Sequence, residues 1–142
     1  MGNGHDRFEE VRERFARSEF HTAFLGLHLD RVAEGEVDVS LAVEPRHRNL
    51  VGTLHGGMIA TLADTATGLA YRTVLEPGTS HVTSSLTVAF LVPGRGGTVT
   101  AKGRVLKRGR RFGYAEADVV DEEGTLLARA TATFTVLPEQ VQ

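Results

Sequence analysis

Asp64 is the residue whose surroundings most suggest chemistry. It lies in an apolar run, with Leu62 and Ala63 before it and Ala66 after it. A carboxylate among such neighbours must be paired, protonated or used in a reaction, because burying an unpaired charge is costly and raises its pKa. The structural alternative is that Asp64 lies at the polar edge of an apolar stripe. Asp64 is therefore a candidate general base or nucleophile.

A helix is the element that must position Asp64. The apolar residues around it recur at the three- and four-residue spacing of a helix with a wide buried stripe. They are Met58, Ile59, Leu62, Ala63, Ala66, Leu69 and Ala70. We expect this helix to run from about Gly56 to Val74 and to stop at residues 76–78, Glu-Pro-Gly.

Gly56 and Gly57 lie where this helix begins. The first backbone N–H groups of a helix have no partner within it and lie at the positive end of its dipole. The Gly56 N–H can therefore bind a carbonyl oxygen as it becomes an oxyanion, a contribution of about 3 to 4 kcal/mol for one good donor. The structural alternative is a tight turn into a packed helix.

The rest of the chain predicts an α+β domain. The apolar residues between Asp6 and Phe20 indicate an amphipathic helix with Asp6 as its N-cap. Alternation around Gly35 predicts a β-hairpin, and four later strands with short Gly-containing turns have the spacing of an antiparallel meander. Those strands are expected at residues 82–92, 98–106, 112–120 and 126–137. One helix against a curved antiparallel sheet of about six strands accommodates this order.

Composition narrows the possible functions. The 142 residues are expected to form one domain, residues 1–142, with an N-terminal segment 1–20 and a core 21–137. A net charge of -2 predicts neither nucleic acid nor an anionic membrane as a partner. The absence of Cys excludes disulfides, thiolate metal sites and a Cys nucleophile. No apolar run approaches the ~20 residues that span a bilayer, and the N-terminus does not resemble a signal peptide, so we expect a cytoplasmic protein.

Histidines are numerous but do not indicate a metal site. His47, His55 and His81 do not stand at a recognised metal-ligand spacing with Asp64, and the remaining histidines fall on other elements. We therefore expect no metal and no cofactor.

The sequence around the two glycines resembles a known family. Asn49-x-x-Gly52-Thr53-x-His55-Gly56-Gly57, followed by Leu-Ala-Asp at 62–64, is similar to the PaaI-type acyl-CoA thioesterases of the hotdog superfamily. The similarity covers about residues 20–137, including the strand end 90–94, Phe-Leu-Val-Pro-Gly. It implies a long central helix wrapped by an antiparallel sheet, and hydrolysis of an aryl- or short- to medium-chain acyl-CoA.

The resemblance also suggests roles for individual residues. Asn49 is expected to orient the water or the carbonyl through its amide, and His55 to hydrogen-bond the thioester, although a His before a helix is also a common cap. Thr83 stands where relatives carry a Ser that positions water, with the neighbouring Ser84 as an alternative alignment. Leu54, Met58 and Gly57 are expected to contact the substrate.

Helix geometry predicts a shared site. Asp64 follows Gly56 by eight residues, about 12 Å along the axis at ~1.5 Å per residue. This is too far for Asp64 to act on a carbonyl bound at its own Gly56. Two antiparallel helices from two subunits would bring Asp64 of one opposite Gly56 and Asn49 of the other. We expect a homodimer with two equivalent sites, and the resemblance implies a dimer of dimers.

Arg110 and Arg111 belong to a basic cluster at residues 107–111. The cluster is either a solvated hairpin turn or a site for the phosphates of coenzyme A, which Arg binds in bidentate fashion.

Two other functions fit the same fold. A hotdog hydratase or dehydratase would need a catalytic His in a different local pattern. A non-catalytic acyl-CoA sensor of the repressor kind would need a DNA-binding segment, and residues 1–20 are too few and too acidic for a helix-turn-helix.

Overall fold

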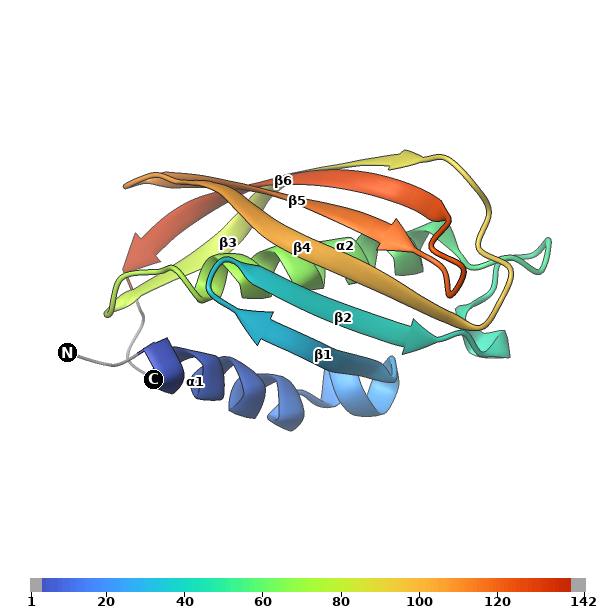
Figure 1. The fold of residues 1–142 in the computed structure, drawn as a ribbon, viewed down its shortest axis with the longest axis horizontal. Helices are drawn as coiled ribbons and strands as arrows, with labels where there is room; N and C mark the ends of the chain where they lie inside the picture. Colours follow the sequence, from blue (N-terminus) through green and yellow to red (C-terminus); the bar gives the residue numbers. More distant parts are fainter. Residues whose placement is uncertain (1–3, 139–142) are drawn as a thin grey trace.

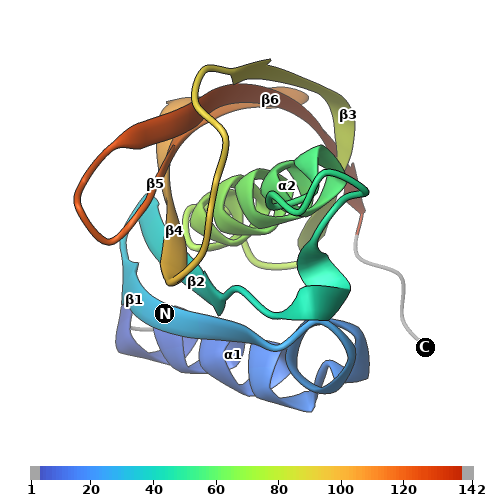
Figure 2. The same cartoon turned by 90° about the vertical axis from the view of Figure 1, so that its right-hand side faces the viewer.

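A six-stranded antiparallel sheet curves around one long helix in the computed structural model, which describes residues 4–138 (Figure 1). The elements are α1 (Gly4–Arg17), a π-helical turn (Glu19–Phe24), β1 (Leu27–Ala33), β2 (Glu36–Ala42), a 3-10 turn (Pro45–His47), α2 (Gly56–Arg72), β3 (Thr79–Phe90), β4 (Thr98–Arg108), β5 (Phe112–Val120) and β6 (Leu126–Pro138). Figure 2 shows α2 inside the curve of the sheet, with α1 beneath β1. The expected hotdog arrangement is confirmed.

The apolar stripe of α2 packs into the concave face of the sheet. Its buried residues are Ile59, Leu62, Ala63, Ala66, Thr67, Ala70 and Tyr71. The small residues of this stripe let β4 approach the helix closely. A Cβ built on Gly103 would lie 2.6 Å from the backbone of Ala66, so only glycine fits there. The helix is thereby fixed against the sheet along its central turns, where Asp64 lies.

The strand order differs from the predicted meander. The sheet runs β1-β2-β4-β5-β6-β3, so only β4, β5 and β6 form a meander. β3 pairs with β6 at one edge, and the segment 91–97 crosses the end of the sheet to bring β4 beside β2. Turn spacing alone cannot show this crossover. It leaves β3, the strand after α2, with one unpaired edge.

The N-terminal helix also differs from the expectation. α1 begins at Gly4, so Asp6 lies inside its first turn and is not the N-cap. Val11 and Phe15 are buried as the pattern predicts, but the helix ends at Arg17. Ser18 caps a separate π-helical turn, which rotates Phe20 out of the stripe and leaves it 55% exposed.

The end of α2 is close to its predicted position. The helix ends at Arg72, two residues before Val74, with Thr73 as its C-cap. Within residues 4–138 no helix is long and apolar enough to cross a membrane.

Candidate active site

Asp64 and Thr83 meet between α2 and β3. The Thr83 hydroxyl donates a hydrogen bond of 2.8 Å to Asp64 Oδ1. The Asp64 side chain is half-buried, which leaves its carboxylate accessible from the side of the helix next to the free edge of β3. One carboxylate oxygen is thus fixed by Thr83 while Oδ2 can still accept a hydrogen bond from water.

A β-bulge selects Thr83 rather than Ser84 as the hydroxyl at this carboxylate. In the pairing of β3 with β6, Thr83 lies opposite Phe134 and Ser85 opposite Thr133, so Ser84 is the extra residue. The Ser84 hydroxyl forms a short hydrogen bond with that of Thr135, away from Asp64. Bulges often re-aim side chains beside active sites.

The bulge also changes which residues of β3 face the helix. His81 and Thr83 face α2 before it, and Leu86 packs against the core after it. From Leu86 onward the even-numbered residues of β3 face the helix, and the last of them, Phe90, lies at the start of α2. Its ring is 3.3 Å from the point that a Cβ of Gly56 would occupy. β3 therefore runs antiparallel to α2, with Thr83 at Asp64 and Phe90 at Gly56.

His55 caps α2 and leaves the Gly56 N–H free. His55 Nδ1 accepts a 2.8 Å hydrogen bond from Gly57 N–H, and Met58 N–H bonds the His55 carbonyl. Among the described residues no acceptor is assigned to the Gly56 N–H. In its neutral form the exposed His55 ring carries its proton on Nε2, which is a second available donor.

Asn49 organises the loop that leads into α2. Its Oδ1 accepts from the N–H groups of Val51 and Thr53, and its Nδ2 donates to Thr53 Oγ1. The amide oxygen is therefore occupied, and the second Nδ2 hydrogen is the part left for a ligand. Leu50 and Val51 at the tip of this loop are almost fully exposed.

The residues expected to contact substrate lie near the first turn of α2. Leu54 is buried and Met58 is half-buried against the core. A Cβ on Gly57 would lie 2.9 Å from His55 Nδ1, so glycine leaves room for the His55 ring in its capping position. An apolar hollow of about 330 Å³ opens between Leu54, Gly56, Ile59 and residues 90–94.

Two histidines outside the predicted site residues, His81 and His21, interact electrostatically with Asp64. Burial lowers the pKa of His81 to about 4, against the opposing effects of a hydrogen bond with the Gly68 backbone and of the Asp64 charge. Burial also lowers the pKa of His21, and the Asp64 charge opposes that shift. Because side chains alternate along a strand, the sequence could have predicted that His81 lies on the same face of β3 as Thr83. No pattern could have placed His21, because the π-helical turn was not predicted.

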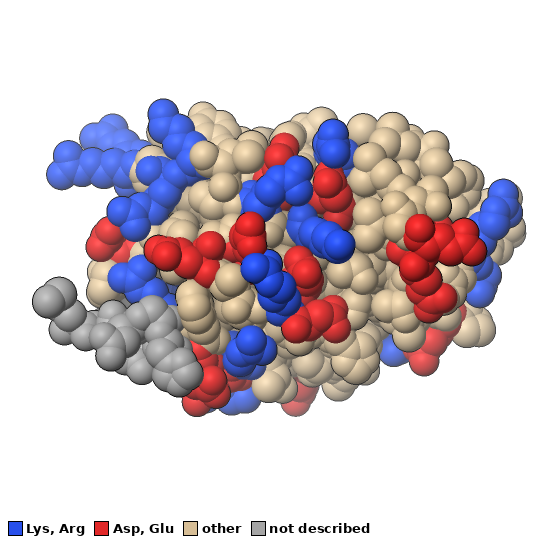
Figure 3. Space-filling model, viewed as in Figure 1, with Lys and Arg blue, Asp and Glu red and all other residues tan. Residues whose placement is uncertain are grey.

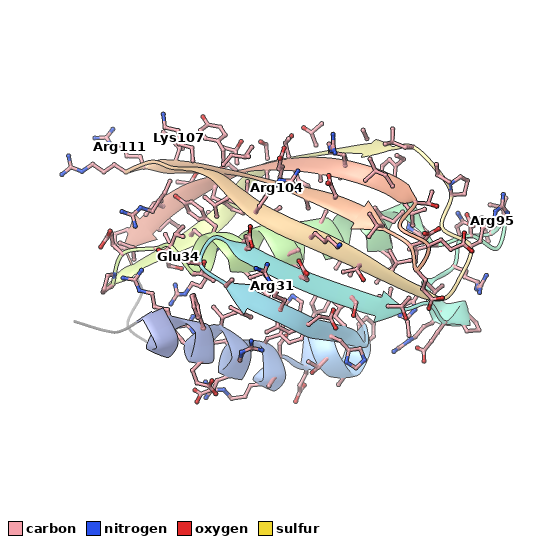
Figure 4. All side chains as sticks on the ribbon, viewed as in Figure 1. Arg31, Glu34, Arg95, Arg104, Lys107 and Arg111 are labelled. Atoms are coloured by element: carbon pink, nitrogen blue, oxygen red, sulfur yellow. The ribbon has the colours of Figure 1, made fainter. Side chains whose placement is uncertain are left out.

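The basic cluster lies at the opposite end of α2 from Gly56. It forms the turn between β4 and β5, and Arg108 ties this turn to the end of the helix by a 2.7 Å hydrogen bond to the Val74 carbonyl. Figure 4 shows Lys107 and Arg111 projecting at that end, and Figure 3 shows Lys and Arg gathered there. Arg110 and Arg111 have no ion pair assigned within residues 4–138. In one chain the cluster and Gly56 are therefore separated by the length of α2.

No metal centre is visible in the described part of the chain, where no group of three His, Asp or Glu side chains could hold an ion. The chemistry assembled here consists of the Asp64 carboxylate, the Thr83 hydroxyl and the N–H of Gly56.

Comparison with known families decides the class of this site. The family model of the thioesterase superfamily matches residues 51–128, more than half of the chain. The chain belongs to the thioesterase superfamily. The match includes Gly56, Asp64 and Thr83, and this thioesterase is accordingly a thioester hydrolase.

Individual relatives agree with this assignment. Acyl-coenzyme A thioesterase 13 of Homo sapiens is 31% identical over 103 residues, which cover 71% of this chain and 73% of the relative. The PaaI protein from the phenylacetic acid degradation operon of E. coli is 25% identical, with a TM-score of 0.88 over 99% of this chain and 100% of that chain. A thioesterase family protein from Silicibacter pomeroyi is 29% identical, with a TM-score of 0.87 over 94% and 99% of the two chains.

Proposed function

We propose that this thioesterase hydrolyses acyl-coenzyme A to a free carboxylic acid and coenzyme A, with Asp64 as the reacting carboxylate. The observation that carries the proposal is the Thr83–Asp64 hydrogen bond of 2.8 Å on a helix whose first N–H has no assigned partner. The human relative, named an acyl-coenzyme A thioesterase, and the PaaI structure support acyl-CoA as the substrate class.

The site is shared by two subunits. Gly56 and Asp64 are eight residues apart on one straight helix, or about 12 Å, so they cannot act on one carbonyl within a chain. Pairing of two free β3 edges about a two-fold axis would place the two α2 helices antiparallel, because α2 is antiparallel to its own β3. Asp64 of one subunit then faces Gly56 of the other.

The reaction follows from this arrangement. The thioester carbonyl oxygen accepts from the Gly56 N–H, with His55 Nε2–H and the second Asn49 Nδ2 hydrogen as further donors. Asp64 of the other subunit removes a proton from water held beside Thr83, and the water oxygen attacks the carbonyl carbon. The carbon–sulfur bond then breaks, and the thiolate takes the proton from Asp64. The reaction consumes only the thioester and one water, and Asp64 returns to its starting state, so we propose that no metal or cofactor takes part.

A second route uses the same carboxylate as a nucleophile. Asp64 attacks the carbonyl carbon, the thiolate leaves, and water hydrolyses the resulting mixed anhydride. Label in the protein after a single turnover in ¹⁸O-labelled water would identify the second route. General-base catalysis places the label only in the product acid, whereas hydrolysis of an anhydride by attack at the Asp64 carbonyl carbon places it in the protein.

The basic cluster at residues 107–111, which forms the turn between β4 and β5, binds the phosphates of coenzyme A. Asp64 and the turn belong to the same subunit, with the end of α2 about 12 Å beyond Asp64, so the pantetheine arm can span between them. We expect Arg110→Ala with Arg111→Ala to raise KM for acyl-CoA by about tenfold, through loss of charge-assisted bonds to phosphate. Arg31→Ala, an exposed arginine on β1 at the sheet edge opposite β3 (Figure 4), is the control. Hydrolysis of the matching acyl-pantetheine, which lacks the phosphates of the nucleotide, should not change; an unchanged KM for acyl-CoA would refute this role.

The direct test of the function is thiol release from a panel of aryl- and alkyl-CoAs by the wild type and by Asp64→Ala. Turnover by the wild type and its loss in an Asp64→Ala protein of unchanged sedimentation would support the proposal. Binding of acyl-CoA by the wild type without turnover of any thioester would refute it. Sedimentation also tests the dimer and its pairing into a dimer of dimers, and a fully active monomer would refute the shared site.

A further inference from the structure

His81 lies on the face of β3 that packs against α2, although no step of the reaction uses it. Its ring packs edge to face against two buried rings, with centroid distances of 5.4 Å to Tyr71 and 5.2 Å to Phe134. The same ring hydrogen-bonds the backbone of Gly68, one turn of α2 beyond Asp64. Its Nε2 lies 3.7 Å from the point that a Cβ of Gly68 would occupy. His81 therefore fixes the start of β3 beside the turn that follows Asp64.

The bulge at Ser84 makes two registers possible for the segment of β3 that precedes it. The structure has what we call the bulged register, in which His81 and Thr83 face α2. In the alternative, regular register, the alternation found from Ser85 onward would continue to the start of the strand without an extra residue. A shift of one residue moves every side chain to the opposite face. The inward residues would then be Val82 and Ser84.

Asp64 does not distinguish between the two registers. Thr83 in the bulged register and Ser84 in the regular one bring the same group, a hydroxyl, to the inner face of β3 beside the carboxylate. The 3.1 Å hydrogen bond from Arg72 to the Thr79 carbonyl does not distinguish them either, because every residue has a carbonyl. The choice of register must therefore come from the side chains at positions 81 and 82.

The two candidates for the inward place at positions 81 and 82 differ in what they gain there. Val82 is an apolar residue of high strand propensity, yet it is 50% exposed in the structure. The regular register would bury it and turn His81 outward. The bulged register is found instead because the His81 ring bonds the Gly68 backbone and packs against the two aromatic rings. A residue without these contacts would leave Val82 as the better inward side chain.

We infer that His81 is a positioning residue, which selects the bulged register and so places Thr83, rather than Ser84, at Asp64. The inference rests on the proposed hydrolysis for the role of the hydroxyl, but not for the register itself. His81→Thr should convert β3 to the regular register, because threonine has neither the ring nor the reach to Gly68. His81→Phe is the matched control, because its apolar ring keeps the inward place among the aromatic rings.

A single cysteine reports the register independently of activity, since the chain has no Cys of its own. Val82→Cys places a thiol outward in the bulged register and inward in the regular one. Its reaction with iodoacetamide should slow about tenfold or more when His81→Thr is added, and should not slow with His81→Phe, because a buried thiol is unreactive. Thr87→Cys is the control position, exposed and beyond the bulge, and it should react equally in all three backgrounds.

Thiol release from acyl-CoA gives the second readout, which a purely structural role of His81 would not change. With His81 present, Thr83→Val should lower kcat about tenfold and Ser84→Ala should leave it unchanged. In the His81→Thr background the two effects should exchange, because Ser84 then supplies the hydroxyl beside Asp64.

Three results would overturn the inference. They are equal reactivity of the thiol at position 82 with and without His81→Thr, a dependence of kcat on Thr83 that persists after this thiol has become protected, and unfolding of His81→Thr, which would show that the regular register is not a stable alternative. A change of register in a protein that hydrolyses no thioester would refute the proposed function and leave the role of His81 in the register standing, so the two failures are distinguishable.

Discussion

Gly56 offers a way to remove the oxyanion donor while keeping the helix. It is the first helical residue after the His55 cap, and proline is well tolerated at that position because its missing N–H has no intrahelical partner. The backbone of His55, with φ -60° and ψ 133°, is extended, as the residue before proline requires. Gly56→Pro therefore deletes one N–H and keeps the start of the helix, although it adds ring atoms beside Phe90.

The size of the effect follows from the role of that N–H. Loss of one oxyanion donor costs about 3 to 4 kcal/mol, or about 10²- to 10³-fold in kcat. Gly56→Ala is the matched control, because it adds the same Cβ beside Phe90 and keeps the donor. That Cβ would lie 3.3 Å from the Phe90 ring, which is half-exposed and can shift. We expect Gly56→Ala to lose activity only slightly.

The assay is thiol release from an acyl-CoA at saturating substrate, with thermal unfolding measured in parallel. Equal kcat values for Gly56→Pro and Gly56→Ala, with both proteins folded, would refute the assignment of the Gly56 N–H as the oxyanion donor. A loss confined to KM would show that the donor binds the ground state as strongly as the transition state.

Three further predictions follow from contacts around α2. Thr83→Val removes the hydroxyl bonded to Asp64 and should lower kcat about tenfold, whereas Thr83→Ser should not; equal kcat values would contradict the role. His81, held at a pKa of about 4 by burial, binds its proton more weakly in the folded state than unfolded, where its pKa is near 6.5. The unfolded state therefore takes up more protons between these values, and about 3 kcal/mol of stability should be lost as the pH falls from 6.5 to 4. Denaturant unfolding across this range should show that loss reduced in His81→Phe and retained in His28→Gln, a control on the exposed face of β1; a retained loss in His81→Phe would contradict it. Gly113→Ala would place a Cβ 2.1 Å from the buried Tyr71 ring and should destabilise the protein by more than about 2 kcal/mol, and unchanged thermal unfolding would contradict this packing.

The sequence predicts the elements of this fold better than their order in space. Alternation around Gly35 and the helical stripe around Leu62 correspond to observed elements, because burial of one face imposes a regular period. The position of β3 beside β6 rests on the crossover at residues 91–97, which depends on long-range pairing. The apolar spacing from Asp6 to Phe20 predicts one continuous helix, and it gives no sign of the π-helical turn, capped by Ser18, that exposes Phe20.

The sequence predicts Asp64 and Thr83 as site residues, but it does not predict the β-bulge at Ser84 that determines which residues of β3 face the helix. Asp64 and Thr83 were chosen from the sequence, and the structure joins them by a hydrogen bond. Phe90 could not be assigned to the helix-facing side, because strict alternation from Thr83 puts even-numbered residues on the other face. The extra residue at Ser84 reverses that alternation, and a bulge leaves no clear signal in a run of Thr and Ser.

The measurement that tests the shared site most directly mixes two inactive proteins. Asp64→Ala subunits keep Gly56, and Gly56→Pro subunits keep Asp64, so neither homodimer has an intact site. After subunit exchange at equal concentrations, about half of the dimers should be mixed, each with one intact site of two, giving about a quarter of the wild-type thiol release. No recovery of activity despite mixed dimers in native mass spectrometry would contradict a site built from Asp64 of one subunit and Gly56 of the other.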